Sequence, residues 1–240
     1  MEDVFLFLLL TFVSSSVGTM TGFGTSTIMV PVLSLFLPIP QTLLFVGIIH
    51  WFGDIWKMIF FKKGWNTKII LLFGIPGVIV SFLAARLPVT ISETLLQKSL
   101  GLFLILYVLF LLFNPQWKIK PSHQTAVTGG VLSGFFAGIF GVGGAVRSTF
   151  LSAYNLEKSV FLFTSGAIGL LVDSSRLTQY IMSEVTLDQS LLITLILCIP
   201  VSLLGAYLAK RLIDKIPQQS FRLLIAIALL LVGLRYLIFS

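Results

Sequence analysis

Long apolar runs separated by short polar breaks extend along the whole chain. A membrane-spanning helix needs about 20 apolar residues, and these runs lack the ten-residue alternation of a transmembrane barrel strand. The pattern therefore predicts an all-α polytopic membrane protein with five membrane segments in each half. The predicted segments are 4–17, 25–37, 41–60, 68–85 and 97–113, followed by 125–140, 145–154, 159–181, 189–209 and 221–239.

Two of these segments, 25–37 and 145–154, are too short to cross a membrane alone. As helices they would reach about 20 Å and about 15 Å, whereas the hydrocarbon core is about 30 Å thick. A glycine cluster precedes each of them, at 22–24 and at 141–144. The first two segments of each half are therefore expected to be short or broken at a glycine-rich turn.

The order of features is the same in both halves. A shift of 119 residues places the first glycine cluster on the second, Asp54 on Asp173 and Lys57 on Arg176. Internal self-similarity of this kind indicates a duplicated structural unit. The predicted units are a first repeat at 1–113, a basic polar linker at 114–124 and a second repeat at 125–240.

Charge in the connections predicts that the two repeats have opposite orientations in the membrane. The connection FFKKGWNTK (60–68) is basic, whereas its counterpart SEVTLDQS (183–190) contains Glu184 and Asp188 and no basic residue. Basic connections favour the cytoplasmic side, so equivalent connections are expected on opposite sides, with both termini outside. Inverted repeats with broken helices at the substrate site are typical of secondary transporters.

Composition supports a multi-pass protein of the cytoplasmic membrane. Hydrophobic residues make up 57% of the 240 residues and charged residues only 10%, about half the charged share of a soluble domain. The net charge of +7 is spread over the connections, so no nucleic-acid partner is expected. A cleaved signal peptide begins with basic residues, whereas this chain has Glu2 and Asp3 there. The first apolar run is therefore interpreted as a membrane segment.

The residues for common enzyme chemistry are sparse. The chain has two histidines, His50 and His123, and one cysteine, Cys198, which excludes an internal disulfide and gives no set of metal ligands. The glycine clusters also lack the Lys-Ser/Thr pair of a nucleotide-binding loop. We expect no metal, no cofactor and no enzymatic activity, and Cys198 is interpreted as a small packing residue.

The glycine breaks form the first candidate site. Backbone N–H groups at the start of a half-helix, at the positive end of its dipole, can bind an anion. Gly130, Gly134 and Gly138 have a different spacing, which favours a close helix-packing face. The candidate substrate-binding residues are Thr21, Gly22, Gly24, Thr25, Ser26, Gly141, Gly143, Gly144, Arg147, Ser148 and Thr149.

Arg147 has no counterpart, because the repeat places Ile28 at its position. An arginine near the bilayer centre costs about 2.5–3.5 kcal/mol on insertion scales. It could snorkel to the interface, pair with an intramembrane carboxylate, or face an anion. We favour the anion, because Arg147 follows the glycine break and its fork of donors suits carboxylate, sulfonate or sulfite oxygens.

The motif Asp-x-x-Lys/Arg forms a second candidate site. Its spacing places Asp54 with Lys57, and Asp173 with Arg176, on one helix face, where acid and base can pair. Lys57 lies near the end of its segment, where snorkelling to the interface is expected. His50 precedes Asp54 by one turn, and histidine changes charge near neutral pH. The motif is therefore either a structural ion pair or a proton-coupling group.

These motifs resemble the sulfite exporter TauE/SafE family of membrane transporters, also called TSUP, over nearly the whole chain. The halves open on GFGTSTIMVPVLSLFLP and GFFAGIFGVGGAVRSTFLSAYNLEKS. The family's glycine-rich elements match 22–24, followed by Pro31, and 141–144. Thr25 stands where a further glycine is common in the family, and Arg147 to Phe150 where apolar residues and a proline are usual.

The resemblance implies a secondary transporter that exports small sulfur-containing or carboxylic anions, such as sulfite or organosulfonates, from a prokaryotic cell. The partners are then the anion, the lipid bilayer and, as a candidate coupling ion, the proton. A passive anion channel that uses the same break as a filter is one alternative, and a non-transporting membrane scaffold is another. The sequence leaves the oligomeric state open.

Overall fold

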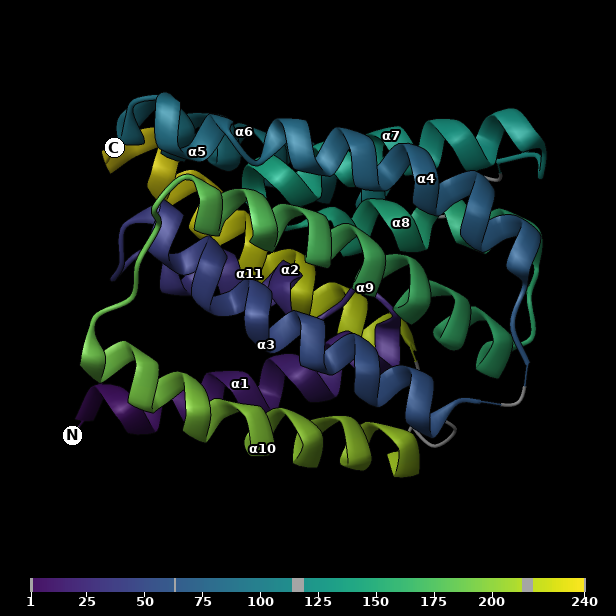
Figure 1. Cartoon of the computed structure of the whole chain (residues 1–240), viewed down its shortest axis with the longest axis horizontal. Coiled ribbons are helices and arrows are strands. Elements are labelled where there is room, and N and C mark those ends of the chain that lie inside the picture. Colours follow the sequence, from purple (N-terminus) through teal and green to yellow (C-terminus); the bar gives the residue numbers. More distant parts are fainter. Residues whose placement is uncertain (1, 63, 114–118, 213–217, 240) are drawn as a thin grey trace.

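The computed structural model describes residues 2–62, 64–113, 119–212 and 218–239, and helices with no strand make up its regular structure there (Figure 1). Each predicted apolar segment overlaps one helix, so the all-helical class is confirmed. The long helices are α1 (Glu2–Thr21), α3 (Ile39–Phe60), α4 (Thr67–Ala84), α6 (Glu93–Phe113), α7 (His123–Phe140), α9 (Lys158–Met182), α10 (Gln189–Leu212) and α11 (Gln218–Phe239).

The short elements interrupt this series at the predicted places. They are α2 (Ser26–Leu33), α5 (Leu87–Thr90), α8 (Gly143–Leu151) and a 3-10 turn, η1 (Ser152–Tyr154). Six of the described helices, α1, α3, α4, α6, α9 and α10, are long and apolar enough to cross a membrane. The chain is therefore a multi-pass membrane protein. Residues 114–118 of the predicted linker lie outside the described residues.

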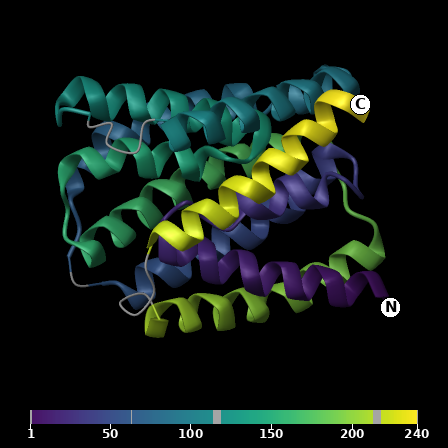
Figure 2. The ribbon, with the colours of Figure 1, turned by 180° about the vertical axis from the view of Figure 1, so that it is seen from behind.

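Helices α3 and α9 pack against each other in the middle of the molecule (Figure 1). The pair α4 and α7 lies on one side of them and the pair α1 and α10 on the other, with α4 packed on α9 and α10 packed on α3. Helix α11 crosses the back of the molecule and packs on α6 (Figure 2). This arrangement surrounds α3 and α9 with protein.

The predicted glycine face of α7 is confirmed, and its partner is α4. A Cβ added to Gly130 would lie 2.3 Å from the Phe73 carbonyl oxygen, and one added to Gly134 would lie 2.4 Å from that of Gly77. Gly138 approaches the Ser81 carbonyl oxygen in the same way, at 2.6 Å. The two backbones can touch only because these positions carry no side chain.

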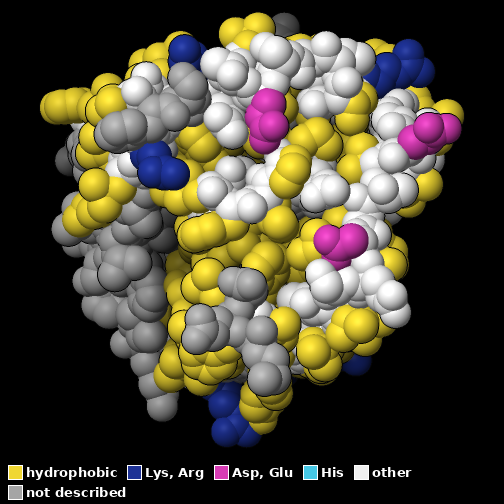
Figure 3. All heavy atoms as spheres, turned by 90° about the vertical axis from the view of Figure 1, so that its left-hand side faces the viewer, with side chains coloured by type: hydrophobic (Ala, Val, Ile, Leu, Met, Phe, Trp, Pro, Cys, Tyr) yellow, Lys and Arg dark blue, Asp and Glu magenta, His cyan; other side chains and the backbone are white. Residues whose placement is uncertain are grey.

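The outer faces of the helices carry apolar side chains. On α4, for example, Leu71, Ile75 and Ile79 are each more than half exposed, as expected for a surface in contact with lipid. The start of α1 and the end of α11 lie on the same side (Figures 1 and 2). Figure 3 shows this face, where single acidic and basic side chains lie among apolar and uncharged ones.

The two connections compared in the sequence lie at opposite ends of the bundle. Residues 61–66 join α3 to α4 at the right of Figure 1, whereas residues 183–188 join α9 to α10 at the left. The first of these connections is basic and the second is acidic. The basic and the acidic connection therefore lie on opposite faces of the molecule.

Candidate functional site: a buried ionic centre

Both glycine clusters reverse the chain between a long helix and a half-helix. After α1, Gly22 and Gly24 have φ angles of +75° and +83°, and after α7, Gly141 has φ +69°. Glycine adopts this left-handed region without the steric cost that a side chain adds. Residues Ser26 and Gly143 then begin the half-helices α2 and α8.

The two breaks are in direct contact. The Ser148 hydroxyl on α8 donates a hydrogen bond to the Gly22 carbonyl oxygen. A Cβ added to Gly144 would lie 2.0 Å from the Phe23 carbonyl oxygen, so only glycine permits this approach. The structure thus brings together two segments that are more than 100 residues apart in the chain.

Six ionisable side chains surround this contact, and each is at most 2% exposed. Three belong to α3, one to α8 and two to α9. A cluster of this kind inside a membrane protein is costly unless its members neutralise one another or serve a function. The six residues of this ionic centre are His50, Asp54, Lys57, Arg147, Asp173 and Arg176.

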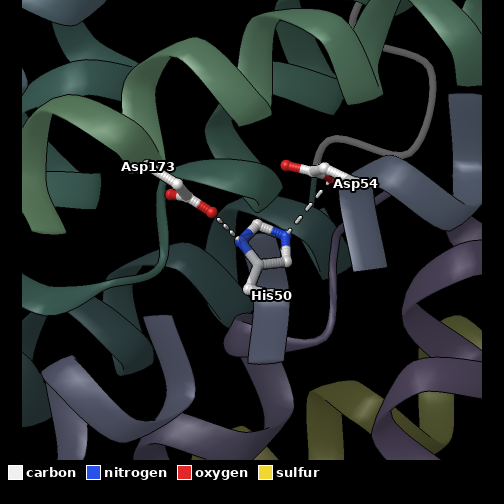
Figure 4. Close-up of side chains that lie close together, drawn as sticks. All are labelled: His50, Asp54 and Asp173. Carbon is white, nitrogen blue, oxygen red and sulfur yellow. Dashed lines mark ion pairs between the residues drawn. The ribbon is translucent and has the colours of Figure 1, made fainter. Parts of the chain in front are cut away.

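The Asp173 carboxylate is held by two close partners. Arg176, one turn further along α9, donates a hydrogen bond from Nε to Asp173 Oδ1 at 2.7 Å. His50 of α3 places Nδ1 2.7 Å from Asp173 Oδ2 (Figure 4). The Ser26 hydroxyl lies 3.5 Å from the same ring nitrogen. One histidine therefore links α3, α9 and the start of α2.

The Asp54 carboxylate is held less regularly. The Lys57 ammonium group contacts Asp54 Oδ1 directly, while His50 Nε2 is 3.8 Å from the same oxygen (Figure 4). Arg147 Nη2 is 4.0 Å from Asp54 Oδ2, and Arg147 Nε donates to the Ser165 hydroxyl at 3.1 Å. Neither Asp54 oxygen makes a hydrogen bond of normal geometry.

Charges in the ionic centre do not balance. Lys57, Arg147 and Arg176 are cations, Asp54 and Asp173 are anions, and with His50 neutral one positive charge remains in excess. Arg147 Nη2 and both terminal nitrogens of Arg176 are buried without a hydrogen-bond partner. An unpaired buried charge is strongly unfavourable, so the centre is suited to an additional anion.

A metal ion fits this centre poorly. One ligand atom each from His50, Asp54 and Asp173 lie within 4.8 Å of one another, which would satisfy the spacing for a cation. Lys57 and Arg176 already neutralise the two carboxylates, however, and a divalent ion would raise the excess charge further. The electrostatics favour an anion over a metal.

Of the predicted binding residues, Arg147 is part of the ionic centre, and Ser26 and Gly24 approach His50. Several of the predicted hydroxyls are bonded elsewhere. Thr21 donates to the Val17 carbonyl oxygen at 2.9 Å and Thr149 to that of Ala145 at 3.0 Å, so each is bonded within its own helix. Thr25 donates to Ser15 on α1 at 3.4 Å. Gly141 approaches Arg176, with 3.5 Å from an added Cβ to Nη1, whereas Gly22, Gly144 and Ser148 form the contact between the two breaks.

The expected snorkelling of Lys57 is wrong. Its side chain is 1% exposed, because Asp54 lies one turn earlier and draws the ammonium group inward. Arg147 is also 1% exposed and approaches a carboxylate of the other half, which excludes its snorkelling as well.

Sequence reasoning missed Ser165 and Gly169 on α9. A Cβ added to Gly169 would lie 2.0 Å from Asp54 Oδ2 and 2.7 Å from Arg147 Nη2, so its absence makes room for that pair. A signal was available: the shift of 119 residues places Gly169 at the position of His50.

Taken together, the helices and the centre define a polytopic α-helical membrane protein with excess positive charge buried where two broken helices meet. A family model described as Sulfite exporter TauE/SafE matches residues 6–236. The chain therefore belongs to the TauE/SafE family of membrane transporters, in agreement with the resemblance seen in its motifs. No curated protein matches the chain.

Proposed function

We propose that the protein is a secondary transporter that exports a small sulfur-containing or carboxylic anion, such as sulfite or an organosulfonate, across the cytoplasmic membrane. The observation that carries this proposal is the excess positive charge of the ionic centre, at the contact of the two glycine breaks. The sulfur chemistry and the direction of transport come from the family. An anion bound near Arg147 would neutralise the centre.

An inverted repeat is the proposed basis of the mechanism. Exchanging helices of the first half for their counterparts keeps two of the main packing relations, since α4 packs on α7 as α10 packs on α1, and α4 packs on α9 as α10 packs on α3. The connections 61–66 and 183–188 lie on opposite sides (Figure 1). By the distribution of basic residues the side with both termini is outside.

In the proposed cycle, the two halves rock about the ionic centre and expose it to one side at a time. Backbone N–H groups of the breaks and the hydroxyls beside them, such as Ser26, replace the water lost by the anion. A proton is proposed as the coupling ion, carried by His50 between Asp54 and Asp173. Histidine suits this role because it changes charge near neutral pH.

A passive channel and a membrane scaffold are the alternatives. The six side chains of the ionic centre are buried, which supports alternating access, because a conducting channel needs a continuous path. Purified protein in sealed vesicles distinguishes the three functions. A transporter accumulates the anion against its gradient when driven by a proton gradient, a channel only equilibrates it, and a scaffold moves none.

The binding role of Arg147 is tested by anion uptake in proteoliposomes with Arg147→Ile, the residue that the first repeat carries. Uptake is expected to fall at least about tenfold, a loss of about 1.4 kcal/mol in anion stabilisation. Arg235→Ile is the control, since Arg235 on α11 is exposed and its loss changes the net charge equally. Unchanged uptake and affinity in Arg147→Ile would make Arg147 structural.

Orientation needs a separate experiment. In a Cys198→Ser background, single cysteines are placed in the 62–68 and 183–189 connections and labelled from outside intact cells. Labelling of the second but not the first is expected. Equal labelling of both would overturn the inverted repeat.

A further inference from the structure

The two carboxylates of the ionic centre differ in how firmly they are held. Asp173 has a hydrogen bond to Arg176 Nε and a contact with His50 Nδ1, both at 2.7 Å. Asp54 meets Arg147 at 4.0 Å, at the outer limit of an ion pair, and the facing atoms, Oδ2 and Nη2, have no hydrogen-bond partner. Lys57 on the same helix holds Asp54 Oδ1, but the contact of Asp54 Oδ2 with Arg147 is loose and is the one that a ligand can most readily replace.

Arg147 is fixed in a way that leaves this donor available. Its Nε donates to the Ser165 hydroxyl at 3.1 Å, which anchors one side of the guanidinium group. The unpartnered Nη2 then faces Asp54 Oδ2. A planar guanidinium binds an oxyanion best through two parallel hydrogen bonds, and Asp54 does not form them here.

The space between Asp54 and Arg147 depends on Gly169. A Cβ there would lie within 2.0 Å of Asp54 Oδ2 and 2.7 Å of Arg147 Nη2. Any side chain at this position would therefore fill the place where the two charges meet. The gap is a feature of α9, which packs against α3.

We propose that Asp54 is an internal counter-ion, which occupies the anion position beside Arg147 when substrate is absent and is displaced when substrate binds. This inference rests on the proposed function. In the empty protein Asp54 limits the buried charge beside Arg147. A carboxylate, sulfonate or sulfite group replaces it, because each offers two oxygens in the geometry that a guanidinium prefers, whereas chloride offers a single atom.

Displacement also explains how binding is linked to movement. Released from Arg147, Asp54 keeps its partner Lys57 on the same helix, so the ion pair that bridges α3 and α8 is broken. The substrate then bridges Arg147 to the rest of the centre. Binding energy is thus used to exchange one set of contacts between the halves for another.

The test compares Asp54→Asn with Asp173→Asn, since each removes one negative charge from the centre. Binding of sulfite, sulfoacetate, acetate and chloride to the purified full-length protein is measured by calorimetry at constant ionic strength. Asp54→Asn is expected to bind its preferred oxyanion at least about tenfold more tightly than wild type, within the usual range for coupled sites. Asp173→Asn is expected to gain much less, and chloride to gain less than the oxyanions.

Two further variants keep the test decisive. Arg147→Ile combined with Asp54→Asn is expected to lose the gain in affinity. If Asp54→Asn leaves Lys57 unpaired and does not fold, the double variant Asp54→Asn/Lys57→Gln restores the charge balance of the centre. It is expected to show the same gain, because Arg147 is still released.

The possible results separate the two proposals. Equal gains in Asp54→Asn and Asp173→Asn would show a simple effect of net charge and overturn the internal counter-ion, while leaving anion transport intact. Wild-type binding without any gain in the Asp54 variants would also overturn it. If neither wild type nor any variant bound these anions, the proposed function would fail, and the inference with it.

Discussion

The two halves of the protein supply different partners to equivalent carboxylates. Asp54 of the first half faces Arg147, a permanent cation on the half-helix α8. Asp173 of the second half faces His50, a ring on the long helix α3 whose charge depends on its protonation. The same acidic position therefore has a fixed partner in one half and a titratable partner in the other.

The two carboxylates have different partners because the two halves carry different residues at two pairs of equivalent positions. The shift of 119 residues pairs Arg147 with Ile28, and His50 with Gly169. In the second half, α8 carries the cation Arg147 and α9 carries Gly169, which leaves room for it. In the first half, α2 carries the apolar Ile28 and α3 carries the imidazole of His50 at the position equivalent to Gly169. Under the proposed duplication, this difference would assign binding to Arg147 of the second half and coupling to His50 of the first.

The largest effect is expected from closing the gap. In Gly169→Ala the new methyl group would collide with Asp54 Oδ2 and Arg147 Nη2, so the pair must separate. We expect anion uptake in proteoliposomes to fall at least about tenfold. Overpacking of this kind also costs about 1–3 kcal/mol of stability, which a thermal-unfolding measurement on the purified variant would detect.

Gly166→Ala is the matched control for that change, one turn earlier on α9. A Cβ there would lie 3.1 Å from the Asp54 carbonyl oxygen, which requires only a small shift. We expect uptake near that of wild type. Equal loss in both variants would mean that α9 tolerates no added volume and that the gap has no specific role.

A smaller effect is expected from removing the titratable partner. His50→Gln keeps a polar side chain between Asp54 and Asp173 but cannot take up a proton. Asp54, Asp173 and the Ser26 hydroxyl, which face the ring, stay in place, as do the cations Lys57, Arg147 and Arg176 that pair with these carboxylates. We expect uptake to depend less on pH than in wild type, because glutamine cannot take up a proton at this position.

The measurement is initial uptake at a series of external pH values, together with the pH change inside vesicles loaded with a dye. In wild type, anion movement is expected to carry protons, whereas in His50→Gln the two signals should separate. Unaltered proton movement in His50→Gln would assign the coupling to another group.

The smallest effect on stability is expected from the N-terminal caps of α4 and α10, the helices that follow the connections 61–66 and 183–188. Asn66 caps α4 by accepting from Ile69 N at 3.0 Å, and Asp188 caps α10 by accepting from Leu191 N at 2.8 Å. The hydrogen bonds from Leu191 N and from the Ser190 hydroxyl lower the pKa of Asp188. Only the Asp188 cap should therefore respond to pH.

The lowered pKa of Asp188 determines how stability changes with pH. The ionised Asp188 stabilises the folded protein above the pKa that aspartate has when unfolded, and this contribution is lost as the pH falls below about 4. Asp188→Asn is expected to remove that pH dependence of the melting temperature. Asn66→Ala should cost about 1 kcal/mol at all pH values, and a pH-dependent loss in Asn66→Ala would contradict this assignment.

The helices were predictable because their signal is local. All ten apolar runs overlap helices, and the positions of the glycine breaks match as well. The packing face of α7 was also predictable, since glycines four residues apart lie on one side of a helix. Such features depend only on hydrophobicity and helical periodicity.

The ionic centre was only partly predictable, because it depends on where α3 and α9 meet. Spacing along one helix indicated the pairs Asp54 with Lys57 and Asp173 with Arg176. The contact of His50 with Asp173 joins residues 123 positions apart, and no periodicity along one helix reports it. Lys57 was expected at the membrane interface because it lies near the end of its apolar segment. The sequence did not show that its contact with Asp54 keeps the ammonium group buried.

The pairing of α1 with α10 has a consequence for synthesis in the cell. Helix α1 is made first, but α10 begins only at Gln189, roughly ten to thirty seconds later at usual rates of translation. During that interval Ser15 and Ser16, which Gly205 of α10 approaches closely in the finished protein, have no α10 beside them. The hydroxyl-bearing face of the apolar helix α1 therefore has to wait for its partner until the second half of the chain has been made.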